Sequence, residues 1–250
     1  MASPDEGLLL QSAELLARLR EKRPRVHLII SPLAAPRAAD ALAALGAEPA
    51  LSEGRQELDA FLQSSQALVV NLGMMDERRE RAAREAADRA CALRLPWLLD
   101  PVKVHQSQRR LALARELLEQ APAVVKPNRE ELFALGAREP EEFARRHRVV
   151  VACTGSIDVL CGPERALRFP GASPYLAAVT AGGCTLGAVM AAFLAVEADP
   201  FKAALAGLAV YREAASWAEE RASGPGTFAA LFLDALHSLE PAALSQRGRA

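Results

Sequence analysis

Short, continuous runs of apolar residues alternate with longer segments of helical periodicity over the first three-fifths of the chain. Strands are expected where the runs occur, at 26–30, 67–72, 97–99, 123–126 and 149–153. Helices are expected between them, at 34–45, 77–93, 107–119 and 129–135. Strands that are apolar along their whole length and are joined by helices form parallel sheets with both faces covered. The pattern predicts an α/β fold, a three-layer α/β/α sandwich around a mostly parallel central sheet.

The pattern changes after residue 153. Two short apolar runs at 158–161 and 166–169 are separated by Gly162 and Pro163, which is typical of a hairpin. Three helical segments follow, at 182–196, 200–221 and 228–239. Neither a long linker nor an internal repeat divides the 250 residues, so we expect a single domain over 1–250.

The charge balance and the cysteines exclude several classes of function. The chain has 30 basic and 31 acidic residues, a balance that argues against a nucleic-acid or membrane-surface partner. Four cysteines without a CxxC pair, together with only four histidines, give no zinc-type spacing. The longest uncharged apolar run, 186–196, is about half of the ~20 residues that a membrane span needs. With an acidic rather than basic first segment, the sequence favours a cytoplasmic protein.

Polar side chains stand at the carboxyl ends of the expected parallel strands. They are Ser31, Asn71, Asp100, Asn128 and Thr154. The carboxyl ends of parallel strands meet at one edge of the sheet, where ligands bind in folds of this kind. Thr154 with Gly155 offers a hydroxyl and a flexible amide to a phosphate, although an ordinary turn has the same composition. We expect the functional site at this edge.

A run of small residues, Thr180 to Cys184, precedes the helix expected at 182–196. Backbone N–H groups at a helix start can approach an anion closely when the side chains are small, and the helix dipole favours negative charge. The same dipole is expected to lower the pKa of Cys184. Gly182 and Gly183 thus form a candidate anion hole with Cys184 as the adjacent base. The alternative is close helix packing around an inert, buried cysteine.

Asn128 and Glu131 lie one helical turn apart at the start of the helix expected at 129–135. In one interpretation Asn128 is the N-cap and Glu131 completes a capping box. In the other, Glu131 and Asp100 hold a hydrated Mg²⁺ near phosphates, because such sites use one or two carboxylates and keep several waters. A strand-end Asp is also a common turn residue, so the sequence leaves both interpretations open.

Taken together, the motifs resemble those of the hydroxyethylthiazole kinases of the ribokinase-like superfamily. The resemblance runs from about residue 8 to residue 239, and its order and spacing are specific. The segments that carry it are ALGAEPAL (44–51), ALVVNLG (67–73), LLDPV (98–102), KPNREEL (126–132), TGSIDVLCG (154–162), VTAGGC (179–184) and GPGTF (224–228).

The resemblance implies a fold, a reaction and an assembly. The fold is the three-layer sandwich, and the assembly is a homotrimer with active sites between subunits. The reaction transfers the γ-phosphate of ATP to the hydroxyethyl group of 4-methyl-5-(2-hydroxyethyl)thiazole with Mg²⁺, a step of thiamine biosynthesis and salvage. The implied site residues are Cys184 as the catalytic base, Lys126, Thr154, Gly182 and Gly183 for ATP, Leu51 and Ala181 for the thiazole alcohol, and Asp100 and Glu131 for the metal.

Several positions depart from the family pattern. The family's Gly-Thr-Gly-Cys becomes the segment from Ala181 to Cys184, and a glycine-rich run is replaced by one that contains Lys103 and His105. Ser31 stands where the family has Asn. Because these changes fall near the expected substrate, two alternatives stay open. One is a kinase of another small heteroaromatic alcohol, and the other is a non-catalytic nucleotide- or metabolite-binding protein.

Overall fold

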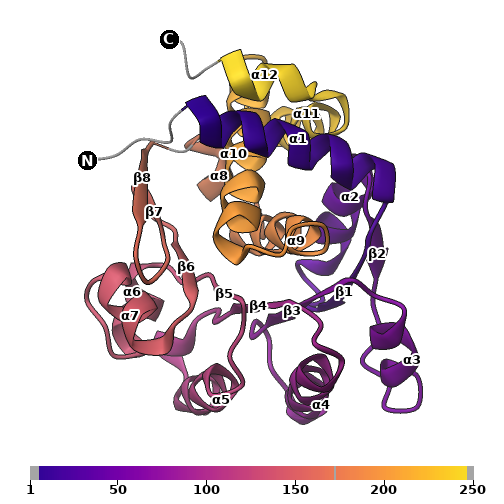
Figure 1. Cartoon of the computed structure of the whole chain (residues 1–250), viewed down its shortest axis with the longest axis vertical. Helices are drawn as coiled ribbons and strands as arrows, with labels where there is room; N and C mark the ends of the chain where they lie inside the picture. The colour runs from indigo at the N-terminus through magenta and orange to yellow at the C-terminus, as the bar shows by residue number, and fades with distance from the viewer. Residues whose placement is uncertain (1–5, 172, 247–250) are drawn as a thin grey trace.

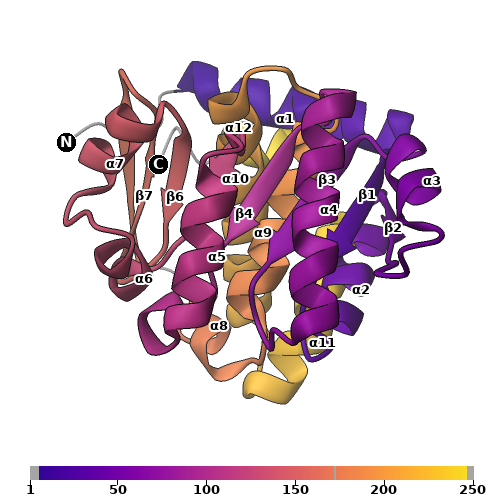
Figure 2. The same ribbon diagram turned by 90° about the horizontal axis from the view of Figure 1, so that it is seen from below.

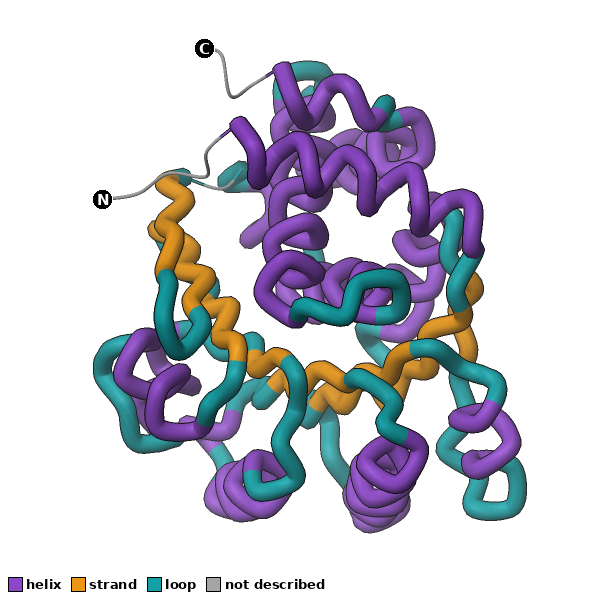
Figure 3. Tube along the Cα trace, viewed as in Figure 1, coloured by secondary structure: helices purple, strands orange, loops and turns teal. Residues whose placement is uncertain are grey.

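An eight-stranded sheet separates two layers of helices in the computed structural model of the chain, which describes residues 6–171 and 173–246. In spatial order the strands are β2 (Glu48–Ala50), β1 (Arg25–Ile29), β3 (Ala67–Asn71), β4 (Trp97–Asp100), β5 (Val124–Val125), β6 (Val150–Cys153), β7 (Ile157–Cys161) and β8 (Ala166–Pro170). The pairs from β2 to β6 are parallel, whereas β6–β7 and β7–β8 are antiparallel. In Figure 3 the strands form one curved band between the helices.

One helical layer is formed by the first two helices and by the helices that follow β8 (Figure 1). Its members are α1 (Glu6–Lys22), α2 (Ala35–Leu45), α8 (Tyr175–Ala178), α9 (Gly182–Leu194), α10 (Pro200–Glu219), α11 (Pro225–Ser238) and α12 (Pro241–Gln246). From Thr185 to Leu194, α9 is buried on all sides, because it lies between the sheet and the other helices of the layer. A helix that is apolar all round is stable only in such a place.

The opposite layer covers the other face of the sheet, and Figure 2 shows α4 and α5 lying across β3 and β4. The layer consists of α3 (Leu58–Gln63), α4 (Glu77–Leu93), the 3₁₀ helix η1 (Val104–Gln106), α5 (Gln108–Leu118), α6 (Arg129–Ala134) and α7 (Pro140–His147). Five buried alanines of α4 belong to the core of this layer: Ala82, Ala83, Ala86, Ala87 and Ala90. Their small side chains let the helix axis approach the sheet closely.

The structure confirms the predicted α/β sandwich, the parallel strands and the hairpin of β7 and β8. It adds elements that the sequence did not predict, namely α1, β2, α3, α7, α8 and α12. It also confirms that the carboxyl ends of the parallel strands share one edge. Within the described residues, no helix has the length and apolarity needed to cross a membrane.

Candidate active site

Two oppositely charged side chains form a buried ion pair at the carboxyl edge of the sheet. Nζ of Lys126, which follows β5, lies 3.0 Å from Oδ1 of Asp100, the last residue of β4. Burial by itself lowers the pKa of Lys126, but Asp100 and other acidic groups nearby raise it above the ordinary value. A Cβ on Gly187 of α9 would lie 3.3 Å from Cε of Lys126, and one on Gly183 would lie 3.8 Å from Nζ. The lysine is therefore packed directly beneath the first turns of α9.

Asn71, at the end of β3, joins this ion pair to Cys184. Its Nδ2 donates to Oδ2 of Asp100 at 2.7 Å and to Sγ of Cys184 at 3.2 Å. Its Oδ1 accepts from the backbone N–H of Gly73 at 3.0 Å, which fixes the orientation of the amide. Asn71 is completely buried. The sequence analysis named all four residues of this network, Asn71, Asp100, Lys126 and Cys184, and the structure brings their side chains together.

The expected low pKa of Cys184 is wrong. Burial and then the negative charge of Asp100 raise the pKa of the thiol to about 11, although Lys126 and the Asn71 amide act in the opposite direction. The desolvation of the thiolate thus outweighs the favourable field at the start of α9. Cys184 is a neutral thiol near neutral pH.

Glu131 is held by two backbone N–H groups. Oε2 accepts from Asn128 at 2.8 Å and Oε1 accepts from Lys103 at 2.9 Å. Asn128 Oδ1 in turn accepts from the N–H of Glu131 at 2.8 Å, so the predicted capping box is present. Burial, followed by the charge of Asp100, raises the pKa of Glu131. This carboxylate therefore fixes the loop before η1 against the start of α6.

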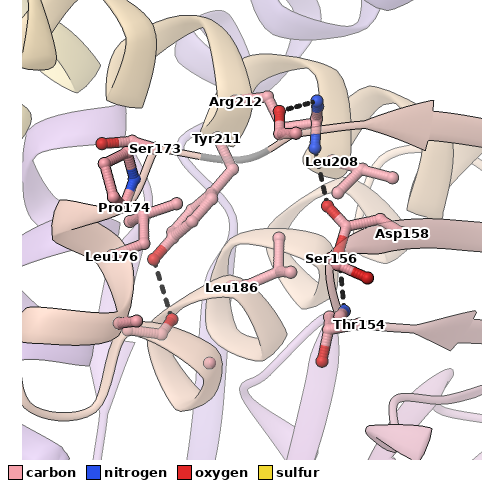
Figure 4. Close-up of a pocket in the computed structure, with 15 residues that line it drawn as sticks. Thr154, Ser156, Asp158, Ser173, Pro174, Leu176, Leu186, Leu208, Tyr211 and Arg212 are labelled. Carbon is pink, nitrogen blue, oxygen red and sulfur yellow. Dashed lines mark hydrogen bonds and ion pairs between the residues drawn. The ribbon is translucent and has the colours of Figure 1, made fainter.

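The start of α9 has the backbone geometry that small residues permit. Ala181 adopts a left-handed conformation, with φ 66° and ψ 14°. A Cβ on Gly182 would lie only 2.8 Å from the carbonyl oxygen of Leu176, so no other residue fits there without a shift of the backbone. The hydroxyl of Tyr211 donates to the carbonyl of Gly182 at 2.8 Å and fixes the turn (Figure 4).

A pocket of about 470 Å³ opens beside this turn (Figure 4). Of the residues assigned to ATP, Thr154, Gly182 and Gly183 line it together, whereas Lys126 lies beneath its edge. Its apolar wall comes from Leu176, Leu186 and Leu208. The size and the mixed polar and apolar lining suit a nucleotide.

A further ion pair in this pocket was not predicted from the sequence. Nη1 of Arg212, on α10, donates to Oδ2 of Asp158, on β7, at 2.7 Å. The other oxygen of Asp158 accepts from the N–H of Gly155 at 3.1 Å. An acidic residue inside the apolar run 158–161 was the available signal, since a buried carboxylate needs a cation or N–H donors.

Leu51 lies in a different pocket, of about 340 Å³, which follows the carboxyl ends of β1 and β2. Its neighbours there include Ile30, Pro32, Ser52 and Glu53, and 42% of Leu51 is exposed. The structure therefore places Leu51 at the same edge of the sheet as Cys184 but outside the pocket that Thr154 lines.

Two carboxylates, Asp100 and Glu131, are available for a cation near Lys126. The negative charge of Asp100 contributes to the raised pKa of Glu131, and the charges of both acids contribute to the raised pKa of Lys126. Within residues 6–171 and 173–246, no three His, Cys, Asp or Glu side chains converge as a ready metal site. A cation here would need ligands from water or from a bound phosphate, which is the usual situation of protein-bound Mg²⁺.

The eight-stranded sheet between two helical layers defines the class of fold, which is that of ribokinase-like proteins. A ribokinase-like superfamily protein from Enterococcus faecalis has a solved structure that matches 94% of this chain and 95% of its own, with a TM-score of 0.68. At 11% identity the likeness concerns the fold alone.

Closer matches identify the family. The model of the hydroxyethylthiazole kinase family matches residues 16–141 and 136–242. A probable hydroxyethylthiazole kinase from Agrobacterium fabrum is 40% identical over 237 residues, which are 95% of this chain and 93% of that protein. The solved hydroxyethylthiazole kinase of Pyrococcus horikoshii is 32% identical, with a TM-score of 0.87 over 91% of this chain and 93% of that one. The chain belongs to the hydroxyethylthiazole kinase family.

Proposed function

We propose that this protein transfers the γ-phosphate of ATP to the hydroxyethyl group of 4-methyl-5-(2-hydroxyethyl)thiazole. One observation carries the proposal: Cys184 lies in a hydrogen-bonded network with Asp100 beside a nucleotide-sized pocket at the start of α9. The membership of the family supports the same reaction. A role in thiamine biosynthesis or salvage belongs to this proposal because the family membership supports it. A cytoplasmic location belongs to it because ATP is the phosphoryl donor.

ATP is proposed to bind in the pocket of about 470 Å³ with its phosphates toward α9. The N–H groups of Gly182 and Gly183, the hydroxyl of Thr154 and the ammonium of Lys126 would contact the phosphates. The first N–H groups of a helix have no partners within it and attract anions. The same arrangement stabilises charge on the transferring phosphoryl group.

Mg²⁺ is proposed to be held by Asp100 and Glu131 together with waters. The carboxylate oxygens suit this hard cation, and each of these acids already accepts N–H donors that orient it. When bound, Mg²⁺ neutralises charge on the phosphate oxygens. Lys126 supplies part of that positive charge from the protein itself.

Cys184 is proposed to lie against the hydroxyl of the thiazole alcohol. In the transfer, the alcohol oxygen forms a bond to the γ-phosphorus and the bond from phosphorus to the ADP oxygen breaks. The transition state of such transfers is loose, so the alcohol proton leaves late and passes to an oxygen of the transferred phosphoryl group. A neutral thiol whose sulfur accepts a hydrogen bond is therefore sufficient to orient the alcohol, and positioning provides most of the rate.

Exposed apolar side chains support an interface between subunits, and the resemblance to the family implies a homotrimer with active sites at such interfaces. Leu33, Leu51 and Met74 follow β1, β2 and β3, which are adjacent in the sheet, and are 64%, 42% and 56% exposed. We propose that a second subunit covers this group and completes the site for the thiazole next to Leu51 and Ala181. Sedimentation velocity at micromolar concentration is expected to show a trimer, and a monomer would contradict the shared site.

The reaction is tested with purified protein, ATP and a panel of small heteroaromatic alcohols. The expected result is Mg²⁺-dependent formation of the thiazole monophosphate, measured by mass spectrometry together with ADP release. EDTA is expected to abolish it, and excess Mg²⁺ is expected to restore it. Faster turnover of a pyridine or pyrimidine methanol would instead assign another substrate. ATP binding without turnover of any alcohol would make the protein a non-catalytic binder.

A further inference from the structure

The guanidinium group of Arg79 is buried between two loops at the carboxyl edge of the sheet. Arg79 occupies the first turn of α4, whose N-cap is Asp76, and only 3% of the residue is exposed. Side chains in a helix tilt toward its N-terminus, so the guanidinium extends back over the loop that enters the helix. A buried charge in this position requires partners on every side.

One arm of the guanidinium reaches the loop that carries Leu51. Nε of Arg79 donates to Oε1 of Glu53 at 2.8 Å. Glu53 is two residues from Leu51 in the loop between β2 and α3. The same loop is fixed on its other side by His27, whose Nε2 lies 2.9 Å from the carbonyl oxygen of Ser52.

The other arm of the guanidinium holds the loop between β3 and α4. Its Nη1 donates to the carbonyl oxygens of Gly73 and Met74, and Nη2 lies 3.5 Å from the carbonyl oxygen of Asn71. This is the loop that orients the Asn71 amide, because the N–H of Gly73 donates to Oδ1 of Asn71. The amide in turn contacts Cys184.

We propose that Arg79 is a positioning residue. It sets the distance between the loop of Leu51, which is proposed to bind the thiazole alcohol, and Cys184, where the phosphoryl transfer is proposed to occur. The chain of contacts runs from Glu53, beside Leu51, through Arg79 to Asn71 and Cys184. The planar guanidinium group has N–H donors on two sides and can bind both loops at once, whereas the compact ammonium group of a lysine cannot span them. Arg79 thus aligns the bound alcohol with Cys184 without touching either.

The proposal rests on the assignment of Leu51 to the thiazole alcohol in the proposed function. The two arms of Arg79 contact different loops, so binding of the alcohol and the rate of the transfer step can be tested separately. Without Glu53 the Leu51 loop loses its contacts with Arg79 and Arg78, whereas Arg79 keeps its contacts with the carbonyl oxygens of the other loop. Binding of the alcohol is therefore expected to weaken more than the transfer step. Losing both arms also disturbs Asn71, so the transfer step slows as well.

The test compares steady-state kinetics of the full chain in three variants. Glu53→Ala is expected to raise KM for the thiazole alcohol about tenfold, with kcat and KM for ATP within about twofold of the wild type. Arg79→Lys is expected to raise the same KM and also to lower kcat about tenfold. Glu53→Gln keeps an oxygen that accepts from Nε, so it is expected to recover most of the loss seen in Glu53→Ala.

Two controls make the outcome decisive. Arg84→Lys changes another arginine of α4, which pairs with Glu80 and Glu116 away from both loops, and is expected to leave all constants unchanged. Leu51→Ala tests the assignment on which the proposal rests. A wild type that phosphorylates no thiazole alcohol refutes the proposed function itself.

The proposal for Arg79 is overturned if Leu51→Ala raises KM for the alcohol but Glu53→Ala does not. It is also overturned if Arg79→Lys raises KM for ATP as much as KM for the alcohol. Equal effects on both substrates are what general loosening of the fold produces.

Discussion

Lys126 and Asp100 form an ion pair of 3.0 Å in which only 4% and 2% of the two side chains are exposed. The second oxygen of Asp100 is held by Asn71, so the carboxylate is satisfied on both sides. Removing one partner of a buried pair leaves a desolvated charge behind, which costs far more than the pair itself contributes. The site therefore depends on this pair for stability before any nucleotide binds.

Lys126→Met is expected to lower the free energy of unfolding by about 3–5 kcal/mol, because it leaves Asp100 charged and unpaired. The double variant Lys126→Met with Asp100→Asn removes both charges and is expected to recover more than half of that loss. Urea denaturation of the wild type, both single variants and the double variant measures the coupling. Strictly additive losses would show that the two side chains do not stabilise each other.

The pKa of about 11 at Cys184 gives a pH dependence with a definite sign. Near pH 8 only about 0.1% of this thiol is ionised, and the thiolate fraction grows about tenfold with each pH unit. We expect the rate of alkylation of Cys184 by iodoacetamide to rise without a plateau up to about pH 10. Peptide mass spectrometry follows Cys184, with the exposed Cys91 in the same sample as the reference. A plateau near neutral pH would mean that the helix dipole controls the thiol after all.

Glu131→Gln distinguishes the role of Glu131 in the capping box of α6 from its proposed role as a ligand of Mg²⁺. Both oxygens of Glu131 accept backbone N–H groups, and the amide of Gln retains only one acceptor oxygen. We expect the free energy of unfolding to fall by about 1–3 kcal/mol and the Mg²⁺-dependent rate to fall much more strongly. Thermal melting and a Mg²⁺ titration of the rate measure the two effects. A loss of stability with an unchanged rate would leave Glu131 as a cap alone.

The central fold could be predicted because its strands are buried on both faces. The runs at 67–72 and 97–99 are apolar throughout, and this pattern has few solutions other than a parallel sheet. The rule that parallel strands end at one edge placed Asn71 and Asp100 at the same edge of the sheet, and the structure shows that they are register partners there. Capping chemistry is equally local, which is why the capping box at Glu131 was visible in the sequence.

The missed elements differ in the strength of their local signals. β2 is three residues long and contains Pro49, and proline is tolerated in a strand only at an edge such as this one. α7 has Pro140 at its start and basic residues in its last turn, which are local signals of a helix.

The missed features of the site depend on long-range contacts. The pKa of Cys184 is controlled by burial, and burial depends on segments far away in the sequence. The contact between Arg79 and Glu53 joins two loops, and no spacing within either loop indicates it.

Ala181→Gly is expected to stabilise the protein. Ala181 has φ 66°, and a left-handed conformation costs a residue with a Cβ roughly 1–2 kcal/mol, whereas glycine adopts it freely. After the greater flexibility of glycine in the unfolded chain is subtracted, a gain of about 0.5–1 kcal/mol remains. The control is Ala112→Gly, at an exposed position within α5, which is expected to destabilise by about 0.5–1 kcal/mol. Equal losses in both variants would show that Ala181 is not strained.

Lys103 combines a strained backbone with an exposed charge next to Glu131. Its φ is 60°, and its N–H donates to Oε1 of Glu131 at 2.9 Å. A left-handed conformation favours glycine, so the backbone at this position is under strain with lysine. The ammonium group of Lys103 can have an effect of its own. Its side chain begins beside Glu131, one of the two acids proposed for Mg²⁺, and carries a mobile positive charge.

Lys103→Gly and Lys103→Ala distinguish the effect of the strained backbone from the effect of the ammonium charge. The glycine variant is expected to be about 1 kcal/mol more stable than the alanine variant, because only glycine relieves the positive φ. Both variants lack the ammonium, so both are expected to lose about tenfold in kcat/KM, or ~1.4 kcal/mol of transition-state stabilisation. Urea denaturation and steady-state kinetics on the same preparations measure the two effects independently. Wild-type rates in both variants would show that the ammonium faces solvent, and the difference in stability would persist.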